Sequence, residues 1–476
     1  MPGLASRLKR NSILSLLSSG TRLVANSLMF IGIARFYGPE VFGSFSAAYI
    51  LASIFIVVGD FGFDNLLTIE VSRSPERVAE SVREYFSIKL LFCLFGLAAI
   101  WSLPLFEQLS PVTETLLFLL SFSVVFTSLT NFFFALFKGI EQFQHEFRIS
   151  SIVNVALLIA LVVIGLLRLS FFYVGLAFVA SRGLALLLAV LKARSTIELS
   201  PFHFTLEGWR KRWRLILIFG FSLVFGNLFF QLITPMLVFL KGDYDAGIYE
   251  SVFKLVAVIC LISDIGVNAI LPTLSRVRIE NVDRWVTLNR LFNRTLFLVS
   301  LPIALAFLVY PRQIIDLLYG VDKFGEAVSI MRVAAAVILV RFASETYGLM
   351  LTTSDRQDVR MKITIAGTVL TVLSCWYFIP KYGSLGAALA ALSVNVCVGL
   401  GYMIAARPYF WRWIREKHHL LPASLAVILG ATLHLVGDRF WILTLCASLI
   451  TYGVLTYYLG YSKYERELLL GIGRQS

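Results

Sequence analysis

The sequence predicts an all-α polytopic membrane protein with about 14 transmembrane helices. Of its 476 residues, 58% are hydrophobic and only 15% are charged, and the mean hydropathy is +0.81. Soluble domains are typically about 45–50% apolar and about 25% charged. The 40 Phe, 18 Tyr and 8 Trp residues also give the chain far too much apolar surface for a disordered protein. Finally, the apolar residues gather into runs of about 20, the length that crosses a bilayer as a helix.

Fourteen segments are long and apolar enough to cross a membrane. In chain order they are 13–34, 42–59, 86–103, 112–137, 149–167, 171–191, 215–239, 248–272, 295–311, 328–350, 363–380, 385–405, 420–437 and 441–461. They leave no room for a soluble domain. The amphipathic stretch 275–294 carries Ile279, Val282 and Trp285 on one side, so we expect it to lie along the membrane surface.

The basic residues predict the orientation of these helices. Of the 42 Lys and Arg residues, 29 fall on the side of the N-terminus, 7 fall on the opposite side and 6 lie within spans. By the positive-inside rule, both termini and the 192–214 loop are cytoplasmic. Charges that face anionic headgroups account for the net charge of +13, so nucleic acid is not an expected partner.

No motif for catalysis, a cofactor or a metal is visible. The five cysteines each lie in an apolar run without a CxxC pair, which is typical of small buried side chains. A Walker loop, HExxH and GxSxG are absent, and His145-Glu146 lacks a second histidine. The sequence therefore predicts a protein that is not an enzyme and that needs no cofactor.

An internal repeat divides the chain. Gly43 is followed by Asp60 and Gly62, and Gly247 is followed at the same spacing by Asp264 and Gly266. The match continues with an asparagine and a Ser-Arg pair, with one residue missing in the second copy. Six predicted spans separate the copies, so both should have the same orientation, related by an axis along the membrane normal. The repeat predicts a six-helix bundle over 1–191, a second over 215–405, and two additional helices within 420–461. Two such bundles are typical of transporters that work by alternating access around a site between them.

Three short motifs near the N-terminus resemble a known family. Residues 34–43 read Ala-Arg-Phe-Tyr-Gly-Pro-Glu-Val-Phe-Gly, residues 59–62 read Gly-Asp-Phe-Gly, and residues 70–73 read Glu-Val-Ser-Arg. This pattern resembles polysaccharide biosynthesis proteins, the O-antigen and exopolysaccharide repeat-unit flippases of the multidrug/oligosaccharidyl-lipid/polysaccharide exporter superfamily. The resemblance implies flipping of an undecaprenyl-diphosphate-linked oligosaccharide across the bacterial cytoplasmic (inner) membrane. Membrane lipid and other polysaccharide-assembly membrane proteins are the partners that it implies.

Four basic residues within the predicted spans are candidates for binding an anionic substrate: Arg22, Arg182, Lys254 and Arg341. A basic side chain at the bilayer centre costs roughly 2.5–3.5 kcal/mol, so each one needs a partner, water or a ligand. A cationic cavity that receives a diphosphate is the functional interpretation, and pairing within a bundle is the structural one. Arg22 has no acidic residue in its own span, which favours the cavity.

The remaining candidates have nearby partners in the sequence. Glu345 follows Arg341 by one turn, which favours pairing, and Glu250 precedes Lys254 by one turn, which leaves pairing and substrate contact equally open. The resemblance also implies cavity cations on the first, second and eighth helices, yet 42–59 contains no basic residue. Asp60 and Asp264 could gate or couple transport, although capping or pairing with an arginine is the simpler interpretation.

Glu345 lies deeper in its span than either aspartate, so it is the better candidate for proton coupling. Two other functions compete with the flippase. A multidrug or metabolite antiporter of the same superfamily would favour acidic and aromatic cavity residues over these basic ones. A membrane-embedded polymerase or ligase would need a large loop or a catalytic cluster, and the sequence shows neither.

Overall fold

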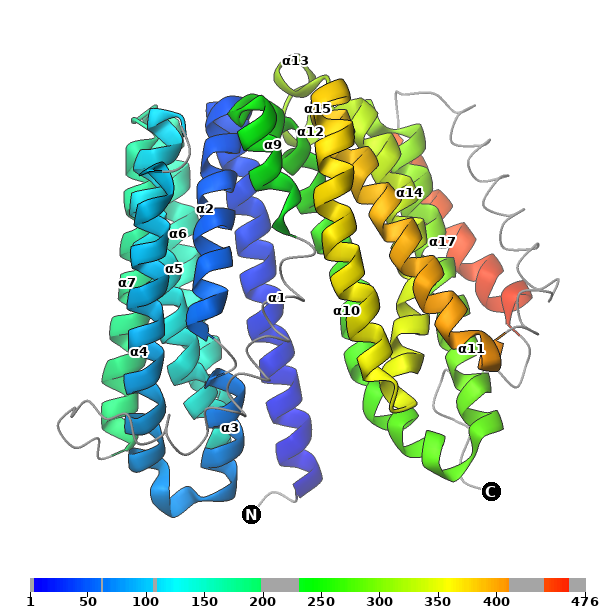
Figure 1. The fold of residues 1–476 in the computed structure, drawn as a ribbon, viewed down its shortest axis with the longest axis horizontal. Coiled ribbons are helices and arrows are strands. Elements are labelled where there is room, and N and C mark those ends of the chain that lie inside the picture. Colours follow the sequence, from blue (N-terminus) through cyan, green and yellow to red (C-terminus); the bar gives the residue numbers. More distant parts are fainter. Residues whose placement is uncertain (1–3, 61–62, 106–108, 198–230, 411–440, 462–476) are drawn as a thin grey trace. The chain divides into compact units, whose positions relative to one another are not determined.

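The chain folds into helices that pack side by side (Figure 1). The computed structural model describes residues 4–60, 63–105, 109–197, 231–410 and 441–461. The regular structure in these ranges is entirely helical, without a strand. The predicted all-α membrane fold is confirmed. Nine helices of the described part are long and apolar enough to cross a membrane, and Pro39–Phe55 is a shorter apolar helix.

The chain forms two compact units, Met1–Ser251 and Val252–Ser476. The first unit contains α1 (Leu4–Tyr37), α2 (Pro39–Asp60), α3 (Phe63–Arg73), α4 (Val78–Ser102), α5 (Pro111–Gly139), α6 (Phe143–Leu166), α7 (Phe172–Thr196) and α9 (Ile233–Lys241). The long helix α10 (Asp243–Glu280) begins in the first unit and ends in the second. The second unit continues with α11 (Val282–Val309), α12 (Pro311–Leu318), α13 (Val321–Phe324), α14 (Ala327–Thr353), α15 (Gln357–Phe410) and α17 (Trp441–Gly460). The two predicted six-helix bundles stay a prediction, because this division by packing does not test the repeat.

In the first unit, α5 lies against α2, α3, α4 and α7, and α6 lies against α1 and α7. The large buried side chains Phe63, Tyr85 and Phe132 belong to the core where α3, α4 and α5 meet. In the second unit, α14 packs between α11 and α15. Of the predicted spans, 420–437 and most of 215–239 lie outside the described residues.

The turns between helices follow from local sequence. Gly38 has a φ of 85° and is followed by Pro39, whose ring suits the first turn of α2. Gly242, with a φ of 99°, makes the corresponding turn before α10. Gly383 has non-helical backbone angles and divides α15 into two parts. That break separates the predicted spans 363–380 and 385–405.

The stretch 275–294, predicted as one separate surface segment, does not form a helix of its own. The structure assigns its first residues to α10 and its last to α11, and Asn281 caps α11 by accepting a 2.9 Å hydrogen bond from the Arg284 amide. Trp285 is fully buried and donates to Thr353 Oγ1 at 3.1 Å. Trp285 therefore packs against α14 of its own unit, where a buried partner for the indole is available, whereas Ile279 and Val282 are 89% and 43% exposed.

Two glycines allow α2 and the start of α10 to touch. A Cβ atom on Gly43 would overlap the backbone carbonyl of Asp243, and a Cβ atom on Gly247 would overlap that of Pro39. Small residues at such crossings let helix backbones approach closely. The contact is reciprocal, since each glycine meets the residue four positions before the other.

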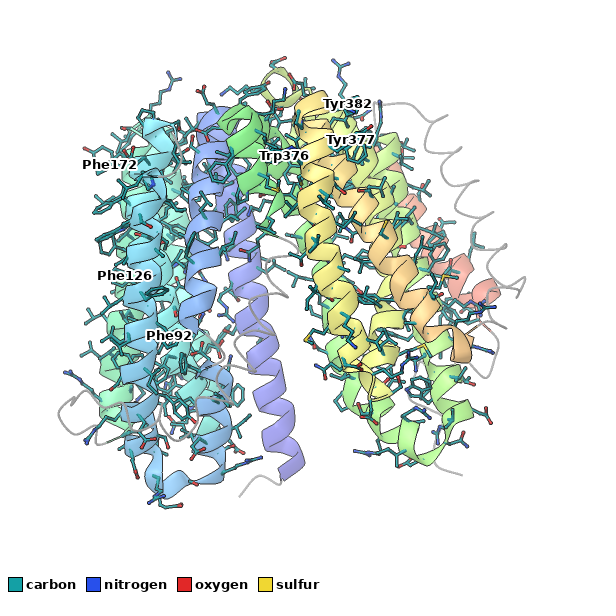
Figure 2. All side chains as sticks on the ribbon, in the orientation of Figure 1. Phe92, Phe126, Phe172, Trp376, Tyr377 and Tyr382 are labelled. Atoms are coloured by element: carbon teal, nitrogen blue, oxygen red, sulfur yellow. The ribbon has the colours of Figure 1, made fainter. Side chains whose placement is uncertain are left out.

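Exposed aromatic side chains gather at the break in α15. Trp376, Tyr377 and Tyr382 are more than half exposed and lie near the turn at Gly383 (Figure 2). Lys381 Nζ stands 3.6 Å from the centre of the Tyr377 ring. Amphipathic rings gather at membrane interfaces, which agrees with a turn at the level of the headgroups.

Candidate functional site

The first unit contains a buried carboxylate between two cations. Glu146 on α6 is 2% exposed and lies 3.2 Å from Arg22 Nη2 on α1. Lys138 Nζ, at the end of α5, lies 3.1 Å from the other oxygen of the same carboxylate. Both cations are about one-third exposed, so they face space that a solute or solvent can reach.

Local sequence places these groups together. Lys138 is in the last turn of α5, and Glu146 is in the first turn of α6. These are the helix ends that favour a cation and an anion, respectively. A short turn, in which Glu141 adopts a φ of 60°, joins the two helices. The carboxylate that α6 supplies is the partner that the span of Arg22 lacks.

Arg182 on α7 has a different environment. Its Nη1 donates to Asn154 Oδ1 on α6 at 3.1 Å, and its Nη2 donates to Asn26 Oδ1 on α1 at 3.4 Å. The guanidinium carbon also lies 4.9 Å from the centre of the Phe178 ring. Among the described residues, the hydrogen-bond partners of this guanidinium are neutral, and it has no ion pair.

The contacts of Arg22 and of Arg182 both involve helices α1 and α6. Asn26 follows Arg22 by one turn of α1, and Asn154 follows Glu146 by two turns of α6. We call this group the N-terminal polar cluster: Arg22, Asn26, Lys138, Glu146, Asn154 and Arg182. It contains three cations and a single carboxylate, so the cluster has a surplus of positive charge that suits an anion.

In the second unit, Arg341 on α14 pairs with Asp264 on α10 at 3.6 Å. Pairing was expected for Arg341, but with Glu345 as the partner. Glu345 instead lies 4.0 Å from Arg360 on α15. Although Arg341 and Glu345 are one turn apart, they point to different neighbouring helices, each of which supplies an opposite charge.

Of the two repeat-related aspartates, the structure describes the side chain of Asp264 only. Asp264 was expected at the end of its span, but α10 continues as far as Glu280, so Asp264 lies inside the helix. Asp60 is the last residue of α2, and its side chain lies outside the described residues. Lys254 follows Glu250 by one turn on α10, and Glu250 accepts a hydrogen bond from Thr234. The substrate-binding and coupling roles of all these residues stay predictions.

Sequence reasoning missed a second buried cation in the first unit. Lys89 on α4 is fully buried and pairs with Asp64 on α3 at 2.6 Å. Its Nζ also lies 5.7 Å from the centre of the Phe132 ring. The position of Lys89 inside the apolar run 86–103 was the available signal. Because Lys89 is fully buried and Asp64 is its carboxylate partner, this pair fastens α3 to α4.

The fold is shared with solved structures of MOP-superfamily transporters at low sequence identity. The structure of the lipid II flippase MurJ in an inward closed conformation matches with a TM-score of 0.74 at 15% identity, over 96% of this chain and 99% of that chain. An inward-facing multidrug resistance MATE transporter matches with a TM-score of 0.66 at 14% identity, over 83% of this chain and 96% of that one.

A MOP-superfamily transporter from Pyrococcus furiosus, described by the reverse polarity of its binding pocket, matches with a TM-score of 0.56 at 15% identity, over 84% of this chain and 95% of that chain. No curated protein matches the sequence. The family model for polysaccharide biosynthesis proteins matches residues 8–278, more than half of the chain. The chain belongs to the polysaccharide biosynthesis protein family. Its family and structural neighbours are transporters and flippases rather than enzymes, in agreement with the sequence prediction.

Proposed function

We propose that this protein flips an undecaprenyl-diphosphate-linked oligosaccharide repeat unit across the bacterial cytoplasmic membrane by alternating access. The product would supply O-antigen, exopolysaccharide or capsule assembly. The observation that carries the proposal is the surplus of positive charge in the N-terminal polar cluster, above all the Arg182 guanidinium with its neutral partners. Membership of the polysaccharide biosynthesis family and the fold shared with a lipid II flippase support it.

The chemistry of the cluster suits a diphosphate. A guanidinium offers parallel N–H donors that match two phosphate oxygens, a geometry that an ammonium group cannot reproduce. Asn26 and Asn154 hold Arg182 in one orientation without neutralising it. A diphosphate that replaced one of these amides would add the attraction between opposite charges to the hydrogen bond, which a neutral amide oxygen does not supply.

The direct test is transport by the purified full-length protein in proteoliposomes. A fluorescent undecaprenyl-diphosphate oligosaccharide is placed in one leaflet, and its appearance in the other is followed with a membrane-impermeant quencher. We expect flipping above that of protein-free vesicles, with competition by unlabelled lipid diphosphate. Efflux of a cationic dye without flipping would instead favour the multidrug antiporter, whose fold the chain also shares.

Arg22 gives a test in cells. In a strain that lacks the gene, Arg22→Ala should nearly abolish surface glycan, and Arg22→Lys should weaken it, because the ammonium retains charge but loses the paired donors. Membrane levels of each variant are checked by blot. Full complementation by Arg22→Ala would remove Arg22 from the substrate site and leave it as the packing partner of Glu146.

A further inference from the structure

An open pocket lies on the outer surface of the first unit, between the start of α6 and the end of α7. Its volume is about 450 Å³, within the range of ligand pockets. Ile152, Leu188 and Leu191 are among the apolar side chains that line it. Ile152 and Leu191 are more than half exposed, as expected for side chains that face lipid. The part of the pocket farther from these helix ends is therefore suited to hydrocarbon.

The rim of the pocket is basic. His145 and Arg148 come from the first turns of α6, and Lys192 comes from the last turns of α7. No carboxylate is among the described residues that line the pocket. Glu146, the nearest acid in sequence, is buried on the opposite face of α6 within the N-terminal polar cluster. The rim thus presents positive charge that no acid of the pocket neutralises.

We propose that this pocket binds an anionic glycerophospholipid of the surrounding membrane. The phosphate lies against Arg148 and Lys192, and an acyl chain runs along Ile152 and Leu191. The helix ends place the cations where headgroups lie, and the exposed apolar residues follow toward the hydrocarbon. Basic pockets between membrane helices on the cytoplasmic side, the side that the sequence predicts for these helix ends, are typical sites for anionic lipid headgroups.

A free anion explains less of the pocket than a lipid does. Inorganic phosphate would use the basic rim but leave the apolar wall against water. A neutral lipid would use the wall but gain nothing from the cations. Only a molecule with a negative headgroup and a hydrocarbon chain fits both halves.

Native mass spectrometry of the full-length protein in detergent tests the proposal. Phosphatidylglycerol is titrated against phosphatidylcholine of the same acyl chains, and inorganic phosphate is added as a competitor. We expect phosphatidylglycerol to bind at least about tenfold more tightly. Because each basic side chain near a lipid headgroup contributes about fivefold, Arg148→Gln combined with Lys192→Gln should weaken the first bound lipid about 25-fold.

Matched variants keep the test sharp. Arg73→Gln combined with Arg194→Gln removes two exposed cations that do not line the pocket, and binding should stay within twofold. Ile152→Trp places a larger side chain in the space beside the apolar wall and retains both cations. It should also weaken lipid binding. Equal loss in the control pair, unchanged binding in both pocket variants, or complete displacement by inorganic phosphate would overturn the proposal. The readout is lipid binding, so its outcome is independent of whether the protein flips a glycolipid.

Discussion

Two partly buried arginines, one in each unit, have opposite kinds of partners. Arg182 in the first unit donates to two asparagine side chains. Arg341 in the second unit pairs with the Asp264 carboxylate. Both side chains place a charge within an apolar helix, at a similar cost in free energy of insertion. From the sequence alone, both are candidates for substrate contact. Their partners differ because the neighbouring helices supply an amide in one unit and a carboxylate in the other.

The comparison distinguishes an arginine that can bind a substrate from one that joins two helices. A carboxylate satisfies an arginine by charge, so a substrate phosphate would have to displace it. Amides satisfy the N–H donors but leave the charge available to an anion. On this reasoning we expect Arg182 to be a stronger candidate for substrate contact than Arg341, whose ion pair joins α14 to α10.

The largest expected effect is that of Arg182→Ala. It removes the charge and both donors, and we expect flipping in proteoliposomes to fall about 100-fold, because a hydrogen bond to a charged group contributes about 1.5–3 kcal/mol. Arg182→Lys should restore part of the activity by returning the charge. If Arg182→Ala flips at the normal rate while folding normally, the difference between the two arginines has no functional meaning.

A smaller effect is expected from Asn154→Asp, which gives Arg182 the kind of partner that Arg341 has. The new carboxylate should compete with the substrate and lower flipping about tenfold, with thermal stability in detergent retained or raised. Asn154→Leu is the matched variant that removes the amide without adding charge. Greater loss in Asn154→Leu than in Asn154→Asp would show that orientation, rather than available charge, is what Arg182 requires.

The smallest effect on transport is expected from Asp264→Asn. It should lower thermal stability, because the ion pair with Arg341 is half-buried and contributes about 1–2 kcal/mol, between the exposed and buried cases. Flipping by the folded protein should stay within threefold. The double change Arg341→Met with Asp264→Leu should recover stability, since apolar residues often replace ion pairs without loss. A large transport defect in that double variant would return Arg341 to the substrate site.

Sequence patterns predicted the individual helices well. The expected spans 112–137 and 328–350 lie within α5 and α14, with ends that differ by three residues or fewer. Their apolar runs are long and bounded by clear signals, such as Ser110 and Pro111 at the start of α5. The single surface segment predicted over 275–294 is instead the end of α10 and the start of α11, because amphipathic periodicity does not show the break at Asn281.

The candidate site was predicted only in part. Arg22 and Arg182 were found because a cation in an apolar run is rare. Glu146 was missed as their neighbour because it lies more than a hundred positions from Arg22, and ion pairs between helices depend on packing. Lys89 escaped notice since its position near the start of a span suggests an exposed side chain, whereas Asp64 and Phe132 enclose it.

The reciprocal contact of Gly43 and Gly247 has the form of a two-fold symmetric interface, in which residue i meets j and j meets i. The two glycines stand 204 positions apart, as do Pro39 and Asp243, which is the offset of the predicted repeat. If that repeat arose by gene duplication, a half-length ancestor would have made this crossing with a second copy of itself. After fusion of the two copies, the two sides of the contact could then have evolved independently. Asp243 now accepts hydrogen bonds from Ser44 and Thr113, both at 2.9 Å, and Pro39, which has no acceptor side chain, cannot return them. The crossing would thus preserve an ancestral dimer surface, and the asymmetric hydroxyl contacts beside it would be the later addition.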